Sequence, residues 1–170
     1  MSTIKQATPE NLTQVQTLIN KVKVAMLTTQ ESDHTLRSRP MVIKTENFSG
    51  VISFLTAIDT PKINELQQNT EVNISLASPG DAIFMSLSGR ARVNQNRTEI
   101  DRLWSEADTL WFPEGKESER IAVISVQVSQ VEYWNSNKLV AAFHMAKDYI
   151  QGETYDGEGT EHEKINVSAS

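Results

Sequence analysis

The sequence predicts a mainly β protein with flanking helices, in which antiparallel strands form a closed or partly closed barrel. The expected elements run in the order helix, three strands, short helix, two strands, helix and one long strand. Turns join most neighbouring strands, and antiparallel hairpins of this kind argue against a doubly wound parallel sheet. A chain of 170 residues also fits one domain and can bury a hydrophobic core of its own.

The first helix is predicted to begin directly after Thr8. This residue supplies a hydroxyl for the N-cap, Pro9 fits the first helical position, and Glu10 lies near the positive helix end. One apolar stripe follows at helical spacing and gives the helix a face for the core. It consists of Leu12, Val15, Leu18, Ile19 and Val22.

Three strands, separated by turns, are expected next. Residues 24–29 indicate a short buried strand, and residues 51–56 indicate the third strand. Residues 37–45 lie between them and are rich in residues that favour strands. They contain Pro40, which confines this stretch to an edge strand or a bulged strand.

A short second helix is predicted at residue 60, where Thr60-Pro61-Lys62 repeats the helix-start signal. Ile63 and Leu66 would form its apolar side. The helix should therefore lie against the barrel with its first turn at the end of the preceding strand.

The remaining elements complete the expected barrel. Residues 71–77 and 82–93 indicate two strands joined by a turn at residues 79–81, and residues 97–106 indicate a helix. Residues 121–134 alternate between apolar and polar side chains, which is typical of a half-buried strand. Six strands are expected in total.

We assign residues 1–150 to a single domain, and no internal repeat divides it. Residues 151–170 are rich in Gly, Glu and Thr and hold few apolar side chains. This stretch is therefore predicted to be a flexible acidic tail.

Composition argues against several function classes. The chain has no cysteine, which excludes disulfides, thiolate metal sites and cysteine nucleophiles. A formal net charge of −6 argues against a general grip on nucleic acid. No signal-peptide pattern and no apolar run of membrane-spanning length is found, so the cytoplasm is the expected location. His34, His144 and His162 lack metal-ligand spacing, and no metal site is predicted.

The most informative local feature is the helix start at Thr60. A helix N-terminus presents unpaired backbone N–H groups and a partial positive charge, and both attract phosphate. A hydroxyl at Thr60 and the ammonium group of Lys62 would add a donor and a full charge. An ordinary capped helix with a solvated lysine gives the same pattern, so the residue types alone leave both interpretations open.

Two more cations, Arg39 and Lys44, lie on the strand expected at residues 37–45. A guanidinium group offers phosphate a planar fork, and an ammonium group offers a compact charge. A spacing of five residues places the two side chains on opposite faces of a regular strand. Either a bulge near Pro40 restores a common face, or the two cations contact different parts of a ligand. A solvated edge strand is the third alternative.

A set of short motifs runs along the chain in a fixed order from about residue 22 to residue 134. The motifs are Arg37-Ser38-Arg39-Pro40-Met41, Leu55-Thr56, Thr60-Pro61-Lys62, Leu87-Ser88-Gly89-Arg90-Ala91, Leu103-Trp104, Trp111-Phe112-Pro113-Glu114-Gly115 and Glu132-Tyr133-Trp134. This set resembles the bacterial general stress protein family, which belongs to the pyridoxamine-5′-phosphate-oxidase-like split barrels. The resemblance implies an FMN-binding split β-barrel, six-stranded and antiparallel, of the Greek-key type.

The resemblance also implies where flavin mononucleotide (FMN) would lie. Arg39 and Lys62 would contact the phosphate, Lys44 would lie toward the polar edge of the ring, and residues 40–42 would run beside the isoalloxazine. Trp134 would reach the flavin from a partner subunit, so that FMN lies at the interface of a homodimer. The implied contacts are Ser38, Arg39, Pro40, Met41, Val42, Lys44, Leu55, Thr56, Thr60, Lys62 and Trp134.

We add Trp111, because its loop of Pro and Gly would let it cover the flavin. The whole interpretation depends on Lys62 and Arg39 facing one shared cavity.

The chain departs from true pyridoxamine-phosphate oxidases after Trp134. Those enzymes carry an Arg-x-His element there, whereas residues 135–139 contain neither arginine nor histidine. Pro61 also stands where superfamily members often carry an arginine. Vitamin B6 oxidation is therefore not expected, and one fewer charge is available to hold phosphate.

The expected function is that of an FMN-binding protein of the general stress type, acting as an oxidoreductase on an unidentified substrate with a nicotinamide electron donor. FMN itself would carry the redox chemistry, and no catalytic acid or base is predicted. One alternative is a non-catalytic protein that stores or senses flavin. Another is a split barrel that binds haem or a deazaflavin, with His144 as the axial ligand in the case of haem.

Overall fold

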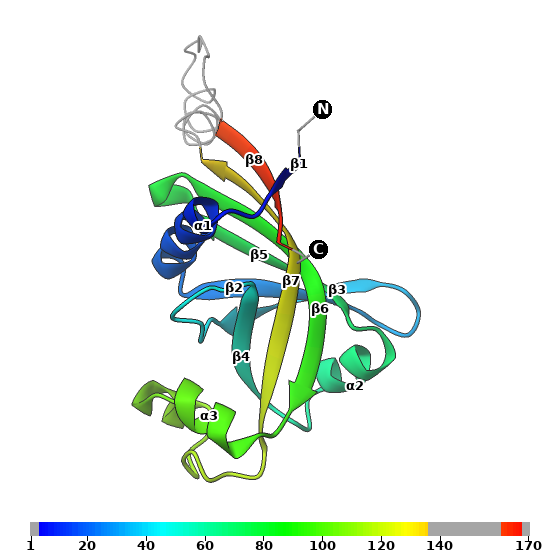
Figure 1. The fold of residues 1–170 in the computed structure, drawn as a ribbon. Coiled ribbons are helices and arrows are strands. Elements are labelled where there is room, and N and C mark those ends of the chain that lie inside the picture. The colour runs from blue at the N-terminus through cyan, green and yellow to red at the C-terminus, as the bar shows by residue number, and fades with distance from the viewer. Residues whose placement is uncertain (1–3, 136–160, 168–170) are drawn as a thin grey trace, which may run out of the picture.

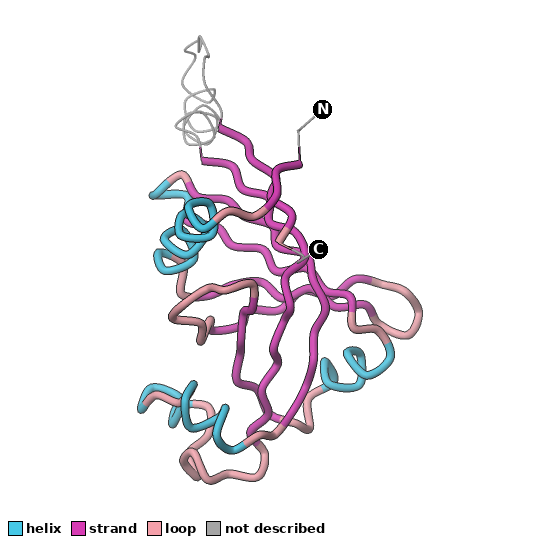
Figure 2. Tube along the Cα trace, viewed as in Figure 1, coloured by secondary structure: helices cyan, strands magenta, loops and turns pink. Residues whose placement is uncertain are grey.

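The computed structural model describes residues 4–135 and 161–167. One eight-stranded sheet with flanking helices forms the protein (Figures 1 and 2). Its strands are β1 (Ile4–Gln6), β2 (Val24–Gln30), β3 (Leu36–Val42), β4 (Val51–Ala57), β5 (Glu71–Ser78), β6 (Ile83–Asn94), β7 (Ile121–Asn135) and β8 (Glu161–Asn166). The helices are α1 (Pro9–Lys21), α2 (Pro61–Gln68) and α3 (Arg97–Leu103), with 3-10 turns η1 (Pro79–Asp81) and η2 (Glu106–Leu110).

The sheet forms a barrel that is split between β3 and β4. Its strand order is β1-β8-β7-β6-β5-β2-β3, and β4 pairs with β7 beside this path. The path thus ends at β1 and at β3, β4 is an edge strand beside it, and the described residues form no ladder between β3 and β4. Just beyond β3, the N–H group of Lys44 still donates to the carbonyl of Ser53 at 2.9 Å. The expected fold class, mainly antiparallel strands with flanking helices, is confirmed.

All six strands predicted from the sequence are present as β2 to β7. β3 is an edge strand, which is where a strand tolerates Pro40, because proline has no N–H group for a ladder. The ladder between β2 and β3 continues through Pro40 without a register shift, so the bulge considered at this position does not occur.

β1 and β8 were not predicted, and β8 lies in the stretch expected to be a flexible tail. β8 pairs antiparallel with β7 and parallel with β1, and Ile165 is fully buried. The structure therefore differs from the prediction for residues 161–166, which belong to the sheet. The rest of the expected tail, 151–160 and 168–170, lies outside the described residues.

The helices begin where the sequence predicts. Thr8 and Asn11 form a reciprocal capping box at the start of α1, and α2 begins at Pro61. α3 ends at Leu103, earlier than the predicted residue 106. In place of a last helical turn, the backbone is extended at Trp104. The centroid of its ring lies 6.2 Å from the centroid of the Phe112 ring.

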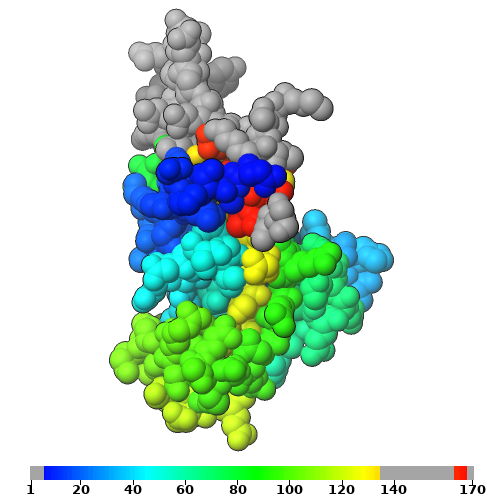
Figure 3. All heavy atoms as spheres, in the orientation of Figure 1, coloured from blue at the N-terminus to red at the C-terminus, as the bar shows by residue number. Residues whose placement is uncertain are grey.

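Two hydrophobic clusters hold these elements together. The larger lies inside the barrel and beneath α1, and the smaller joins α3 to β7 and contains Ile100, Leu103 and Phe112. As a result, α3, η2 and the loop that follows gather into one lobe at one end of the molecule (Figure 3). Of the helices in the described ranges, none is both long enough and apolar enough for a membrane crossing.

A β-bulge interrupts the ladder between the two long strands β6 and β7. The register shifts between Ser88 and Gly89, so that Ser129 is the extra residue of β7 and has no register partner on β6. A Cβ atom on Gly89 would lie 2.3 Å from the carbonyl oxygen of Gln127, closer than any real contact. Glycine is therefore required here, and the bulge bends the long strands as they pass around the barrel.

Candidate functional site

The main candidate site is a cleft of about 280 Å³ that opens at the split of the barrel. The end of β3, the end of β4, the start of α2 and the segment after η2 surround it. Its lining residues are Pro40, Met41, Val42, Lys44, Leu55, Thr56, Ala57, Thr60, Lys62, Asp108, Trp111 and Phe112.

Nine of the twelve site residues predicted from the sequence line this cleft. The other three, Ser38, Arg39 and Trp134, do not. Three lining residues were missed: Ala57, Asp108 and Phe112. The structure thus brings together segments at residues 40–44, 55–62 and 108–112 that are far apart in the chain.

Lys62 provides the cation at one end of the cleft. Its Nζ atom lies 2.9 Å from Oγ1 of Thr56 and 3.0 Å from Oγ1 of Thr60, and it forms no ion pair with any described residue. The pKa of Lys62 is lowered, mainly because burial disfavours the charged form. Repulsion from Arg39 lowers this pKa further, and attraction to Glu65 partly offsets both effects. An anion placed here would relieve this unfavourable environment.

The hydroxyl of Thr60 has a different role from the one expected. It donates to the carbonyl of Ala57 at 2.8 Å and accepts from Lys62, and it does not cap α2. Thr60 therefore tightens the turn between β4 and α2 and fixes Lys62 beside the helix start.

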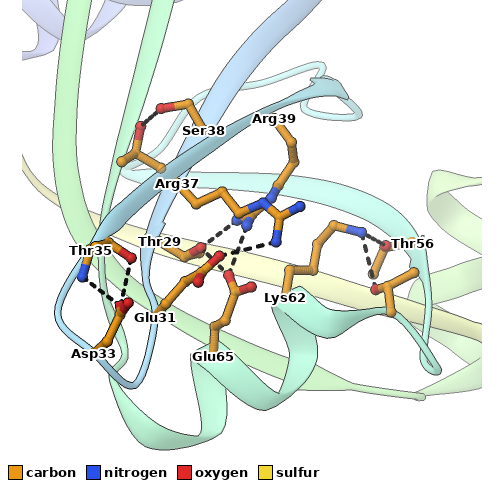
Figure 4. A network of polar contacts seen from close by, with 12 residues as sticks. Thr29, Glu31, Asp33, Thr35, Arg37, Ser38, Arg39, Thr56, Lys62 and Glu65 are labelled. Carbon is orange, nitrogen blue, oxygen red and sulfur yellow. Dashed lines mark hydrogen bonds and ion pairs between the residues drawn. The ribbon is translucent and has the colours of Figure 1, made fainter.

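The side chain of Arg39 points toward Thr29 and Glu65 (Figure 4), and Arg39 does not line the cleft. Its guanidinium group donates to Oε2 of Glu65 at 2.8 Å and to the hydroxyl of Thr29. Both charged side chains are largely buried, at 17% exposure for Arg39 and 9% for Glu65. The two cations thus share one polar network, but only Lys62 lines the cavity. The prediction that Arg39 and Lys62 face one shared cavity is therefore wrong for Arg39, and any assignment of a phosphate ligand to this cleft depends on Lys62 without Arg39.

Lys44 lies at another part of the cleft and is compensated by a carboxylate. Its Nζ atom is 2.6 Å from Oδ2 of Asp108, which also accepts from the N–H group and the hydroxyl of Ser105. β3 ends at Val42, so Lys44 lies beyond the strand, and the two cations pair with different carboxylates, Arg39 with Glu65 and Lys44 with Asp108. Of the alternatives considered for these cations, separate positions match the structure.

The wall between these charges is mostly apolar. Met41 and Phe112 are buried, whereas Trp111 is 67% exposed and extends from the loop at the rim. Small-molecule sites commonly enclose about 300–1,000 Å³. The cleft in one chain, at about 280 Å³, is therefore slightly smaller than this range, and the exposed Trp111 leaves one of its walls open to solvent.

The two predicted residues on the outer face of the sheet are Ser38 and Trp134. Ser38 forms a hydrogen bond of 2.7 Å with Thr28 on the neighbouring strand. Trp134 faces Phe84 in the β6–β7 ladder and does not reach the cleft of its own chain.

An apolar surface lies on the outer face of β2 and β3, next to the cleft. Val24 faces Val42 across the ladder, and Met26 faces Pro40. All four side chains are exposed. The surface thus continues from the cleft wall, which Pro40 and Val42 also line.

No group of three or more potential metal ligands occurs among the described residues. His34 lies in an exposed turn with a φ of 68°. His144 falls outside the described residues, and nothing is described of the side chain of His162. The arrangement suits an elongated ligand with an anionic end at Lys62 and an apolar body along residues 40–42.

The sequence matches the family described as pyridoxamine 5′-phosphate oxidase like over residues 10–156. The fold is also similar to that of a general stress FMN/FAD binding protein from Xanthomonas citri, at 25% identity and a TM-score of 0.66. That match covers 76% of this chain and 92% of the other.

Two more distant structures share the fold alone. General stress protein 26 from Bacillus anthracis is 22% identical with a TM-score of 0.63, and the match covers 73% of this chain and 91% of the other. A heme binding protein from Mycobacterium smegmatis is 12% identical with a TM-score of 0.58, over 75% of this chain and 55% of the other. No curated protein matches the sequence.

Proposed function

Because the chain belongs to the pyridoxamine 5′-phosphate oxidase-like family, we propose that it binds FMN in the cleft at the split of its barrel. The observation that carries the proposal is the position of Lys62. Its ammonium group lies at the start of α2, half-buried, at the end of an apolar cleft and in no ion pair with a described residue. A phosphate monoester would supply the negative charge that Lys62 lacks as a partner here.

The residues of the cleft fit the parts of FMN. Lys62, the hydroxyl of Thr56 and the first turn of α2 would hold the phosphate. The strand at residues 40–42 would lie along the isoalloxazine, with Lys44 toward its polar edge. Trp111 would cover the exposed side of the ring.

We further propose that FMN lies at the interface of a homodimer. The apolar surface of Val24, Met26, Pro40 and Val42 borders the cleft and is exposed in the single chain. A second copy on this surface would enlarge the cleft, and Trp134, which does not reach its own cleft, would then be supplied to the partner's.

FMN, when bound, supplies hydride and electron transfer, while the protein orients it and controls access. We propose a flavin-dependent oxidoreductase that takes electrons from a nicotinamide donor; a non-catalytic storage or sensing protein is the competing function. Reduction of bound flavin by NADH or NADPH separates the two. Residues 135–139 lack the Arg-x-His element, so pyridoxamine-phosphate oxidation is not part of the proposal.

Haem and deazaflavin stay open as alternative ligands, and no observation among the described residues favours either. His144, the axial ligand that the sequence offered for haem, lies outside the described residues. The similarity to the heme binding protein concerns the fold alone.

The test is the absorption spectrum of the purified protein, followed by titration of the ligand-free protein with FMN, riboflavin and haemin. A flavin spectrum and saturable FMN binding, with a dimer in light scattering, are expected. A Soret band in the purified protein, or no affinity for FMN, would overturn the assignment.

A further inference from the structure

Glu65 is a buried carboxylate in the second turn of α2, for which the proposed FMN contacts have no use. It is only 8% exposed, and it lies three residues after Lys62 on the same short helix. Burying a carboxylate is costly unless cations and hydrogen-bond donors compensate it. Its surroundings must therefore supply that compensation.

The compensation comes from two neighbouring strands. Oε2 of Glu65 accepts from the guanidinium group of Arg39 on β3 and from the hydroxyl of Thr29 on β2. The Thr29 hydroxyl in turn accepts from Arg39, so the three groups form a closed triangle. Figure 4 shows this triangle directly beside the side chain of Lys62.

The triangle changes the charge available to an anion in the cleft. Lys62 and Arg39 each carry one positive charge, and Glu65 removes one, which leaves one net positive charge at this end. The pKa of Lys62 reflects both neighbours, since Arg39 lowers it and Glu65 raises it. The three groups are therefore close enough to act on the same bound anion.

Resting on the FMN-binding function proposed above, we infer that Glu65 is a positioning residue that neutralises Arg39 and holds it back from the cleft, so that the phosphate of the ligand is held less tightly than two cations would hold it. A guanidinium group has five N–H donors, and Thr29 and Glu65 account for two of the bonds that it makes here. The site thus contains a second cation, Arg39, that does not hold the phosphate, and bound FMN can dissociate and be replaced by FMN from solution.

The substitution Glu65→Gln tests this inference, because it removes the charge and keeps the shape. FMN, which carries the phosphate, should bind about fivefold to tenfold more tightly than to the wild type, the effect of one added charge in a partly solvated site. Riboflavin, which has no phosphate, should bind as before. Glu31→Gln is the matched control, since Glu31 pairs with the exposed Arg37, which lies on β3 like Arg39. The affinities of this variant for FMN and for riboflavin should stay unchanged.

A merely structural role for Glu65 predicts something different, namely that Glu65→Gln weakens FMN and riboflavin alike. That result, or an unchanged ratio of the two affinities, would overturn the inference. If the wild type binds neither flavin, the proposed function itself fails, which is a separate and visible outcome.

The double substitution Glu65→Gln with Arg39→Gln keeps the inference testable even if the single variant does not fold. It replaces the ion pair by two amides of similar shape and leaves the net charge at the cleft unchanged. The FMN-to-riboflavin affinity ratio should then stay within about twofold of the wild-type ratio. A loss of tenfold or more would show that Arg39 contacts the phosphate despite Glu65, and the inference would be wrong.

Discussion

Replacing Lys62 by methionine removes the one cleft cation that has no carboxylate partner among the described residues. Methionine keeps the length and apolar stem of the side chain and deletes only the ammonium group. The structure predicts a loss of FMN affinity without a comparable loss of folding stability. Lys62 contributes two hydrogen bonds to threonine hydroxyls, and its environment already disfavours its charge.

The size of the loss follows from the contact that would be removed. A hydrogen bond to a charged group contributes about 1.5–3 kcal/mol. Lys62 is half-exposed to solvent, which screens the interaction, so we expect about 2 kcal/mol, or roughly a 30-fold weaker binding of FMN. Riboflavin should lose less than about threefold, because it has no phosphate for Lys62 to hold.

Lys44→Met provides the contrast within the same cleft. Lys44 is paired with Asp108 at 2.6 Å, so the pair presents little net charge to a ligand. Its removal leaves a buried carboxylate that keeps only its bonds from Ser105. Folding stability should fall by about 2–4 kcal/mol, whereas FMN affinity should change by only about threefold.

The assay is a fluorescence titration of ligand-free protein with FMN and with riboflavin at constant salt and pH. Lys116→Met is the control for loss of a positive charge, because Lys116 forms an exposed ion pair with Asp101 away from the cleft. Equal FMN affinity in the wild type and in Lys62→Met would refute the reasoning. So would an equal loss for FMN and riboflavin, since no phosphate contact could then be involved.

Three further predictions concern stability. The folded-state pKa of Lys62 is lowered, so between that pKa and the ordinary lysine value the unfolded chain binds more protons; the free energy of unfolding of ligand-free protein should rise with pH in this window, and urea titrations should find that contribution absent in Lys62→Met. Gly89→Ala should cost at least about 2 kcal/mol in denaturant unfolding, because its Cβ would meet backbone of Gln127, whereas Gly80→Ala, with no atom nearby, should cost almost nothing. Ile165→Ala should cost about 2–4 kcal/mol in the same assay, and a midpoint identical to the wild type would mean that β8 adds nothing to the fold.

Local signals in the sequence were sufficient for much of the fold and cleft. The start of α2 depends on neighbours within a few residues, and Thr60-Pro61-Lys62 therefore predicted both the helix and a cation at its beginning. The six central strands were found because their apolar residues alternate or form short continuous runs. Even the bulge has a trace in the sequence, since two polar residues separate Val128 from Val131.

The rest depends on contacts between distant residues. The charges that compensate the buried carboxylates of Glu65 and Asp108 come from Arg39 and Lys44, 26 and 64 residues away. An acidic residue is normally expected on the surface, so the residue types alone do not predict that either one is buried. β8 was missed for a similar reason, since its sequence is polar around the fully buried Ile165 and its place in the sheet depends on pairing with β7.

The position of β8 between β1 and β7 has a consequence for how the chain acquires its fold. β1 has no other strand neighbour in the described sheet, and Ile4 faces Lys164. On the edge of β7 that faces away from β6, β4 pairs with the first half and β8 with the second half. The second half of this edge therefore stays unpaired during synthesis until β8 has been made. Contacts between such distant segments form slowly, and an open strand edge can pair with other chains. Until β8 docks, the second half of β7 is therefore an edge with which another chain can pair.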